Sequence, residues 1–318
     1  MNNQAIWLRA IRVLFSGLSA VLPLVAFTLV SADAESFRDE TPRIAIVSAF
    51  APELKILKGG LSHKSDHTVN GVEFTTGTLE GQTVVLFLSG IGIVNAAMNT
   101  QLALNRFAIR QIVFSGIAGG VDPSLNIGDV VIAERWGQYL EMLFAREVGG
   151  GWEKVPFFDY PYGNFGMMFP RSVTILRAGL DKPETRFWFP VDESLMAAAR
   201  RAADKVTLKG CMEDGTCLES SPQVTVGGSG VSGSAFVDNA AFRIWVFETF
   251  DARVLDMESA AMAHVAYSND VPFIAVRSLA DLAGGGEGAN QMNIFLGIAA
   301  ANAATLVREL LREVPDIY

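Results

Sequence analysis

The chain has 318 residues, half of them apolar, with 25 Lys and Arg against 34 Asp and Glu, only 2 Cys and only 3 His. This composition excludes disordered, collagen-like and disulfide-dense proteins and fits one sizeable globular domain. The net charge of −9 argues against a nucleic-acid-binding surface, which needs clustered Lys and Arg, and three His argue against a His-built metal centre.

The N-terminal segment has the pattern of a secretory signal. Arg9 and Arg12 precede the apolar run 13–30, which is followed by an Ala-x-Ala motif ending at Ala34. We predict cleavage after this motif and a mature domain of residues 35–318 that is exported, either to a periplasm or out of the cell. Because the run is slightly longer than a usual signal, an uncleaved membrane anchor stays open as the alternative, and it would be the chain's only membrane contact.

Beyond this segment, strand-like and helix-like stretches alternate. Short β-branched or apolar runs predict strands at 43–48, 71–79, 83–88, 111–114, 127–132, 223–227, 253–256 and 272–277. Helices are predicted shortly after the first strand and at 94–107, 259–268 and 293–313, and 115–120 is predicted to be a glycine-rich turn. This alternation indicates an α/β fold: a single domain with a mostly parallel or mixed twisted central sheet, flanked by helices.

One segment, 136–190, departs from this alternation. It holds 13 of the chain's aromatic residues amid Gly and Pro, with little helical periodicity. A long irregular stretch inside a compact domain is usually functional. We interpret it as an insertion and leave two roles open: a satellite hydrophobic cluster that packs on the sheet or on a dimer partner, or a lid over an apolar substrate group.

The two cysteines, Cys211 and Cys217, enclose a short polar stretch. In an oxidising compartment such neighbours pair and pin a loop, so we predict a disulfide bond, with two free thiols as the alternative. A zinc or redox role is disfavoured, because the spacing is not C-x-x-C and no His lies nearby.

Three acidic residues follow strand ends, where functional loops gather in sheets of this kind. Glu53 comes just after the first strand, Glu258 follows 253–256, and Asp281 follows 272–277. Two of them also have a purely structural interpretation, since Glu258 suits the positive end of a helix dipole and Asp281 suits a helix N-cap.

Six motifs in one order resolve this ambiguity. They are Glu53 after the first strand, Ser-Gly-Ile-Gly at 89–92, the glycine run and its continuation at 116–129, Ser-Gly-Ser-Ala-Phe at 232–236, Met-Glu at 257–258 and Arg-Ser-Leu-Ala-Asp at 277–281. Together they resemble the purine nucleoside phosphorylase/nucleosidase superfamily, specifically its 5′-methylthioadenosine/S-adenosylhomocysteine nucleosidase branch, over about residues 43–312. The insertion, the cysteine pair and Asp-Asn-Ala-Ala-Phe-Arg at 238–243 look more like its secreted relatives, including plant vegetative storage proteins.

The resemblance implies a role for each matching residue. Asp281 would protonate the purine at N7, and Glu53 would activate water. The residues implied to bind the nucleoside are Met257 and Glu258 at the ribose, Phe236 and the backbone of Val237 at the base, and Ala118 and Gly119 at the sugar pocket. An oxocarbenium-like transition state needs an acid and a base, so neither a metal nor a cofactor is expected. Ala280 and Ile117 depart from the pattern, because many nucleosidases have small hydroxyl residues at these two positions.

The nucleophile distinguishes a hydrolase from a phosphorylase. Arg is the usual ligand for phosphate, and neither the loop 48–53 nor the two residues before the glycine run include one. The resemblance therefore implies hydrolysis of an adenine nucleoside, such as 5′-methylthioadenosine or S-adenosylhomocysteine, by a homodimer. Two alternatives stay open: a phosphorylase that uses Arg146 or Arg171 of the insertion, and a nucleoside-binding or storage-like protein without turnover.

Overall fold

The computed structural model describes residues 38–286 and 288–315, and all of these belong to one compact unit. The predicted signal segment and its cleavage site lie outside the described residues.

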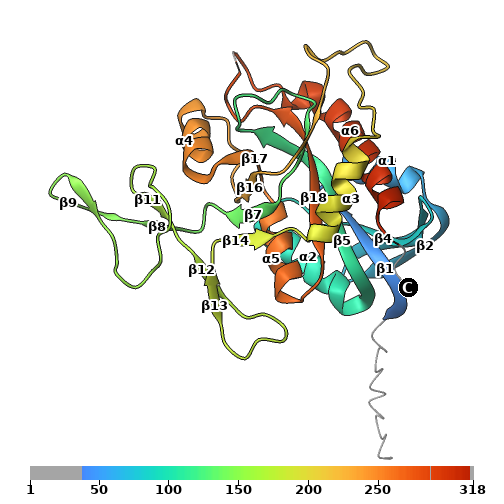
Figure 1. Cartoon of the computed structure of the whole chain (residues 1–318), viewed down its shortest axis with the longest axis horizontal. Coiled ribbons are helices and arrows are strands. Elements are labelled where there is room, and N and C mark those ends of the chain that lie inside the picture. Colours follow the sequence, from blue (N-terminus) through green and yellow to red (C-terminus); the bar gives the residue numbers. More distant parts are fainter. Residues whose placement is uncertain (1–37, 287, 316–318) are drawn as a thin grey trace, which may run out of the picture. The chain divides into compact units, whose positions relative to one another are not determined.

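A twelve-stranded mixed sheet forms the centre of this unit (Figure 1). Its strands are β1 (Asp39–Ser48), β2 (Ser62–Val69), β3 (Val72–Leu79), β4 (Gln82–Leu88), β5 (Phe107–Gly120), β6 (Val130–Ile132), β7 (Arg135–Gln138), β14 (Trp188–Pro190), β15 (Val224–Val226), β16 (Ser229–Ser232), β17 (Ala252–Asp256) and β18 (Phe273–Asp281). Nine strands follow one another in the order β14-β7-β16-β17-β5-β1-β4-β3-β2. The other three branch from β5: β18 pairs with β5, β6 pairs with β18, and β15 pairs with β6. The predicted fold class, a mixed central sheet with helices around it, is confirmed.

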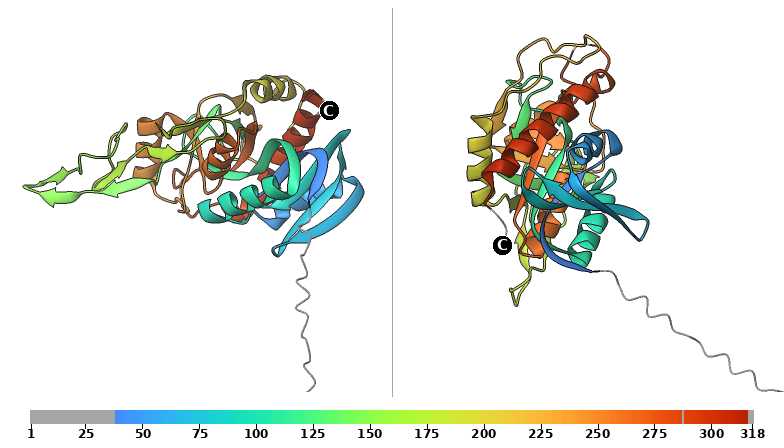
Figure 2. Two further views of the ribbon diagram at one scale, coloured as in Figure 1. Left: turned by 90° about the horizontal axis from the view of Figure 1, so that it is seen from below. Right: turned by 90° about the vertical axis from the view of Figure 1, so that its right-hand side faces the viewer.

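Within residues 38–286 and 288–315, six helices flank the sheet. They are α1 (Ala51–Gly59), α2 (Ile93–Arg106), α3 (Glu193–Ala203), α4 (Ala240–Phe250), α5 (Ser259–Ser268) and α6 (Met292–Glu313). Helices α3 and α6 cover one face, whereas α2 packs with α5 on the other (Figures 1 and 2). By length and composition α6 would suit a membrane span, but it packs on β18 and β5 and more than half of its most apolar 18-residue window is buried, so it serves as a core helix of this unit.

The long strand β5 corrects one prediction. The predicted turn 115–120 is instead a continuation of β5, and these residues pair with β18 and β17. Glycine is needed at these positions because a side chain would not fit. A Cβ atom at Gly120 would lie 2.8 Å from Cδ1 of Leu279, and one at Gly119 would lie 3.1 Å from Oδ1 of Asp281. Glycine here allows close approach between strands and does not mark a change of chain direction.

The aromatic insertion begins and ends at the edge of the sheet. Its two ends pair with each other, since β7 and β14 are antiparallel with Trp136 opposite Phe189. Between them three two-stranded ribbons project from the sheet (Figures 1 and 2), formed by β8 (Met142–Phe144) with β11 (Met168–Pro170), β9 (Arg146–Val148) with β10 (Gly151–Glu153), and β12 (Val173–Ile175) with β13 (Glu184–Arg186). Tyr139 and Phe187 pack with Phe250 in a second apolar cluster, which is the satellite cluster proposed from the sequence.

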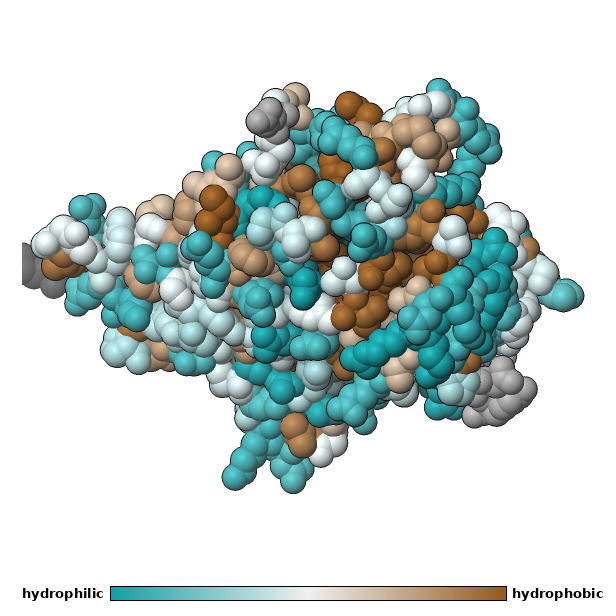
Figure 3. All heavy atoms as spheres, turned by 45° about the horizontal axis from the view of Figure 1, so that its top comes forward, coloured by the Kyte–Doolittle hydropathy of each residue, from teal (hydrophilic) through white to brown (hydrophobic). Residues whose placement is uncertain are grey.

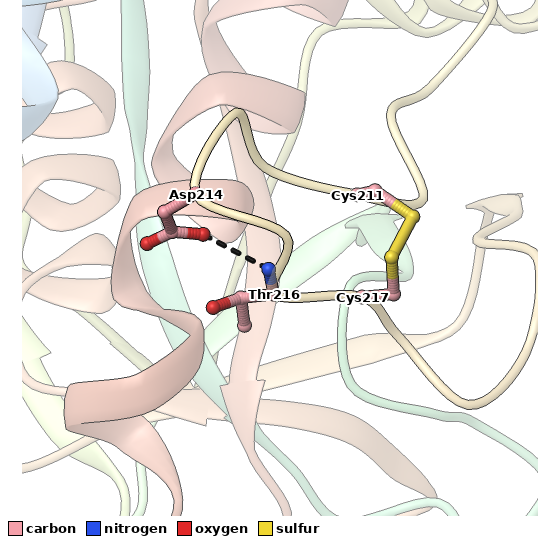
Figure 4. The surroundings of a disulfide bond; sticks show 4 residues. All are labelled: Cys211, Asp214, Thr216 and Cys217. Carbon is pink, nitrogen blue, oxygen red and sulfur yellow. Dashed lines mark hydrogen bonds between the residues drawn. A yellow bond between two sulfur atoms is a disulfide. The ribbon is translucent and has the colours of Figure 1, made fainter.

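The cysteines form a disulfide bond, Cys211–Cys217, that closes a small loop (Figure 4). Inside the loop, the backbone N–H of Thr216 donates to Oδ1 of Asp214 at 2.9 Å. The loop lies against α6, because the buried side chain of Asn302 bonds to both the N–H and the carbonyl of Lys209 just before it. The disulfide therefore closes an exposed loop, and the hydrogen bonds of Asn302 hold the residue before this loop against α6.

Candidate active site

One cavity of 330 Å³ gathers the residues singled out in the sequence. All eight predicted catalytic and binding residues line it: Glu53, Ala118, Gly119, Phe236, Val237, Met257, Glu258 and Asp281. They come from distant parts of the chain and meet because β1, β5, β17 and β18 end at the same side of the sheet. None of the insertion residues 136–190 lines this cavity.

Glu53 lies in the first turn of α1, directly after β1, and its side chain is 2% exposed. Its Oε2 accepts the backbone N–H groups of Ala49 at 2.9 Å and Phe50 at 3.1 Å, and its Oε1 accepts that of Ile117 at 2.9 Å. Burial raises the pKa of Glu53, while the charge of Arg277 and these three N–H donors act against the rise. The carboxyl is thus fixed in position at the end of two strands.

Arg277 is the functional residue that sequence reasoning did not assign. It lies in β18, is 2% exposed, and pairs with Asp256 (Nε to Oδ2, 3.0 Å) and Glu258 (Nη2 to Oε2, 3.3 Å). Its guanidinium stacks 4.3 Å above the Phe114 ring centroid, and its Nη1 has no hydrogen-bond partner among the described residues. A charged residue inside an otherwise apolar strand was the available signal, because buried Arg is rare unless it is paired.

Gly116 makes the approach of these charges possible. A Cβ atom on Gly116 would collide with Nη1 of Arg277 and would lie 2.9 Å from Oε1 of Glu53. Gly116 therefore leaves the space in which the carboxyl of Glu53 and the guanidinium of Arg277 approach each other.

Glu258 occupies the N-cap position of α5, but its side chain makes no capping hydrogen bond. Its Oε1 accepts the N–H of Gly92 at 2.8 Å, and its Oε2 faces Arg277. Burial raises the pKa of Glu258 to about 7, with the charge of Arg277 opposing the rise and that of Asp256 adding to it. The helix-dipole interpretation accounts for neither contact, so this carboxyl is held as a polar group of the cavity.

Asp281 is the last residue of β18, and no helix begins until Met292. The N-cap interpretation is therefore wrong, and Oδ1 of Asp281 accepts the N–H of Ala283 at 2.7 Å instead. Burial raises the pKa of Asp281 to about 6, and the nearby charge of Asp238 adds to the rise. A carboxyl in this environment keeps its proton to higher pH than an exposed Asp does.

The remaining walls are mostly apolar. They include Phe50, Ile91, Met257, Met292 and Leu296, which come from the first turns of helices and the loops before them. Apolar side chains also gather on the face of the molecule shown in Figure 3, between polar rims. Phe236 and Ile91 remain 55% exposed, so the cavity opens to the outside between them and the deeper carboxyls. Such a site suits a flat apolar ring system with a few polar groups.

Comparisons with known proteins bear directly on this site. A model of the phosphorylase superfamily matches residues 43–312, which include every residue that lines the cavity. The chain belongs to the phosphorylase superfamily.

Within this superfamily, the chain is similar to 5′-methylthioadenosine/S-adenosylhomocysteine nucleosidases. The 5′-methylthioadenosine/S-adenosylhomocysteine nucleosidase of Bacillus thuringiensis (strain Al Hakam) is 33% identical over 272 residues, which cover 85% of this chain and 99% of the relative. The crystal structure of the nucleosidase of that name from Neisseria meningitidis, in complex with methylthio-immucillin-A, has a TM-score of 0.63 at 26% identity and covers 86% of this chain and 99% of that one. The Colwellia psychrerythraea 34H nucleosidase in complex with adenine has a TM-score of 0.65 at 25% identity, covering 87% and 97%.

The raised pKa of Glu258 predicts a pH dependence of stability. Folded Glu258 retains its proton at pH values where the unfolded chain has released it, so the free energy of unfolding falls as pH rises from about 4.5 to about 7. We expect Glu258→Gln to flatten this decline, measured by urea unfolding across that interval. The control Glu248→Gln, at an exposed position of α4, should keep the wild-type slope. An unchanged slope in Glu258→Gln would show that this carboxyl titrates normally.

Proposed function

We propose that this protein hydrolyses the N-glycosidic bond of an adenine nucleoside, 5′-methylthioadenosine, S-adenosylhomocysteine or a related 5′-modified adenosine, and releases adenine. The observation that carries the proposal is the pair of buried carboxyls, Glu53 and Asp281, in one mostly apolar cavity of a chain that is similar to nucleosidases in sequence and fold. The hydrogen bonds and charges around the two carboxyls differ, and this difference decides which one we assign as the acid and which as the base.

Asp281 is the acid in this proposal. Its raised pKa of about 6 leaves part of the carboxyl protonated near neutral pH, and it can donate that proton to N7 of the purine. The C1′–N9 bond then breaks, its electron pair goes to the base, and adenine leaves as a neutral molecule. The sugar develops oxocarbenium character in the transition state, as in glycoside hydrolysis.

Glu53 is the base. Its carboxylate is held by three N–H donors and faces Arg277, so it is ionised more readily than burial alone would allow. Water attacks C1′ while Glu53 accepts one of its protons, and the other hydrogen remains on the new sugar hydroxyl. Two carboxyls complete the reaction without any other reactive group.

The remaining predicted residues bind the nucleoside. Glu258 accepts hydrogen bonds from the ribose hydroxyls, with Met257 beside it on the same turn. Phe236 and the backbone of Val237 contact the base, and Ala118 and Gly119 of β5 line the sugar pocket. Apolar walls at Phe50, Ile91, Met292 and Leu296 favour an apolar 5′-group.

Charge favours water over phosphate as the nucleophile. Arg277 of β18 does line the cavity, although the loop 48–53 and the two residues before the glycine run contain no Arg, but Asp256 and Glu258 already pair with it. Neither Arg146 nor Arg171 reaches the cavity, and Arg171 pairs with Glu141. A dianion would therefore meet a net negative environment.

We further propose that the protein is exported. Arg9, Arg12, the apolar run and the Ala-x-Ala motif support export, and the Cys211–Cys217 disulfide suits an oxidising compartment, as expected for a secreted relative in this superfamily. We expect the exported protein to lack residues 1–34, which N-terminal sequencing of the periplasmic or secreted fraction tests.

We also propose a homodimer. Ile91, Val94 and Met98, at the start of α2 and just before it, are 55%, 76% and 57% exposed, and Ile91 also borders the cavity. A second copy of the chain would cover this apolar strip and the cavity entrance together. Sedimentation of the mature protein should give twice the chain mass, and a Val94→Asp variant should shift it toward the monomer. A monomeric wild type at micromolar concentration would contradict the proposal.

Removing either catalytic carboxyl should stop the reaction. We expect Asp281→Asn and Glu53→Gln each to lower kcat by about 10²- to 10⁴-fold, since each removes one proton transfer. Adenine released from 5′-methylthioadenosine is followed chromatographically, with Glu248→Gln as the control. Asp281→Asn should still bind the nucleoside. Turnover at the wild-type rate in this variant would remove Asp281 as the acid, and no turnover by the wild type on any adenine nucleoside would favour the binding or storage alternative.

Phosphate separates the two enzyme classes. The wild-type protein should release adenine at the same rate with and without phosphate and should yield the free sugar. Release that requires phosphate and yields the sugar 1-phosphate would instead establish a phosphorylase.

A further inference from the structure

Asp281 borders two cavities of opposite character. On one side lies the mostly apolar 330 Å³ cavity of the proposed active site. On the other lies a polar cavity of 140 Å³, to which Asp238, Asn290, Gln291 and the glycines of the loop after β18 contribute. The carboxyl of Asp281 therefore separates a substrate-sized apolar space from a smaller polar one.

Asn290 connects the polar cavity to the acid. Its Nδ2 donates to Oδ1 of Asp238 at 3.2 Å, and its side chain also bonds to Asp281. The orientation of the amide is fixed, because its Oδ1 accepts the N–H of Met292 at 2.9 Å and the NH₂ group must then point toward the two carboxyls. Together with the N–H of Ala283, Asn290 holds Asp281, whereas Ala280 before it offers no side-chain donor.

The proposed reaction requires a return path for a proton. Each turnover leaves Asp281 deprotonated and Glu53 protonated, so Asp281 must regain a proton before the next cycle. While substrate or adenine fills the apolar cavity, water from its mouth does not reach Asp281 freely. The polar cavity has space for several water molecules and polar groups to hold them.

We propose that the polar cavity is the route by which Asp281 recovers its proton, with Asp238 as the carboxylate that passes protons from solvent through water, and Asn290 as the residue that positions Asp281. This inference rests on the proposed function. Asp238 is exposed, so it exchanges protons with bulk water freely, and Asn290 joins it to the buried acid. In each transfer a hydronium or neutral Asp238 gives one proton to the water chain, and the chain gives one to Asp281.

Three neighbouring side chains set the electrostatic environment of Asp281. Asp238 raises the pKa of Asp281, the hydrogen bond from Asn290 lowers it, and Arg243 is the cation beside the loop, where a Cβ atom on Gly285 would collide with its guanidinium. Arg243 is turned toward the backbone, since its Nε donates to the carbonyl of Gly120 at 3.0 Å.

Asp238→Asn tests the route, with Asp181→Asn, an exposed site in the insertion, as the control. We expect Asp238→Asn to lower kcat at least about tenfold at low buffer concentration, because reprotonation becomes limiting, and we expect added imidazole buffer to restore it. Wild type and Asp181→Asn should show no dependence on imidazole. An Asp238→Asn enzyme with normal kcat, or one whose loss imidazole does not restore, would overturn the route.

Asn290→Ser tests the positioning role, since serine keeps an acceptor for the N–H of Met292 but is too short to reach Asp281. The basic limb of the profile of kcat/KM against pH should move to higher pH in Asn290→Ser and to lower pH in Asp238→Asn, because the two changes act on the pKa of Asp281 with opposite sign. A merely structural effect would lower activity at every pH without opposite shifts, and that result would remove Asn290 as a positioning residue.

Asp281→Asn distinguishes failure of this inference from failure of the proposed function. If Asp281→Asn is inactive while Asp238→Asn behaves as wild type, only the proton route is wrong. If Asp281→Asn turns over normally, the acid assignment itself fails, and the route fails with it.

Discussion

The buried guanidinium of Arg277 is the charge on which the rest of the site depends. Asp256, Glu258 and Glu53 are each less than 5% exposed, and burying three carboxylates without a cation would cost far more than the fold could supply. Arg277 pairs with two of them and opposes the rise that burial causes in the pKa of the third, Glu53, and the Phe114 ring packs against its guanidinium plane. Removing one member of such a cluster leaves an unpaired buried charge, so the cluster acts as a unit.

The glycines of β5 are the structural condition for this cluster. Side chains on neighbouring strands normally keep two backbones and their charges apart, but at Gly116 the missing Cβ lets Glu53 and Arg277 approach across the strand. The same strand then supplies the N–H of Ile117 to Glu53, so its backbone takes the place of side-chain donors. At Gly119 the same absence lets Asp281 lie close to β5. One glycine-rich strand thus brings Glu53 and Asp281, the base and the acid of the proposed reaction, to one cavity.

Much of this site could be predicted because strand ends converge. Glu53, Glu258 and Asp281 were grouped from their positions after strands, and the structure brings them to one cavity. The glycine run was misinterpreted as a turn, since local propensity treats Gly as a breaker while the pairing with β18 requires it within a strand. Helix α4 was missed because its sequence is apolar on all sides and shows no helical period. Arg277 was quoted within a motif but given no role, because only the fold shows what surrounds it.

Glu53 and Asp281, the two carboxyls of the proposed reaction, are both buried, so burial alone cannot decide which is the acid. The number of donors decides it. Glu53 receives three backbone N–H bonds and the field of Arg277, all of which favour its ionised form. Asp281 receives one backbone N–H and one amide bond, and it faces the negative charge of Asp238. Ala280 adds no hydroxyl that would stabilise the anion further, so the departure at this position helps Asp281 keep its proton. Donors and charges therefore favour ionisation at Glu53 more than at Asp281, and in the proposed reaction this asymmetry assigns the direction in which protons move.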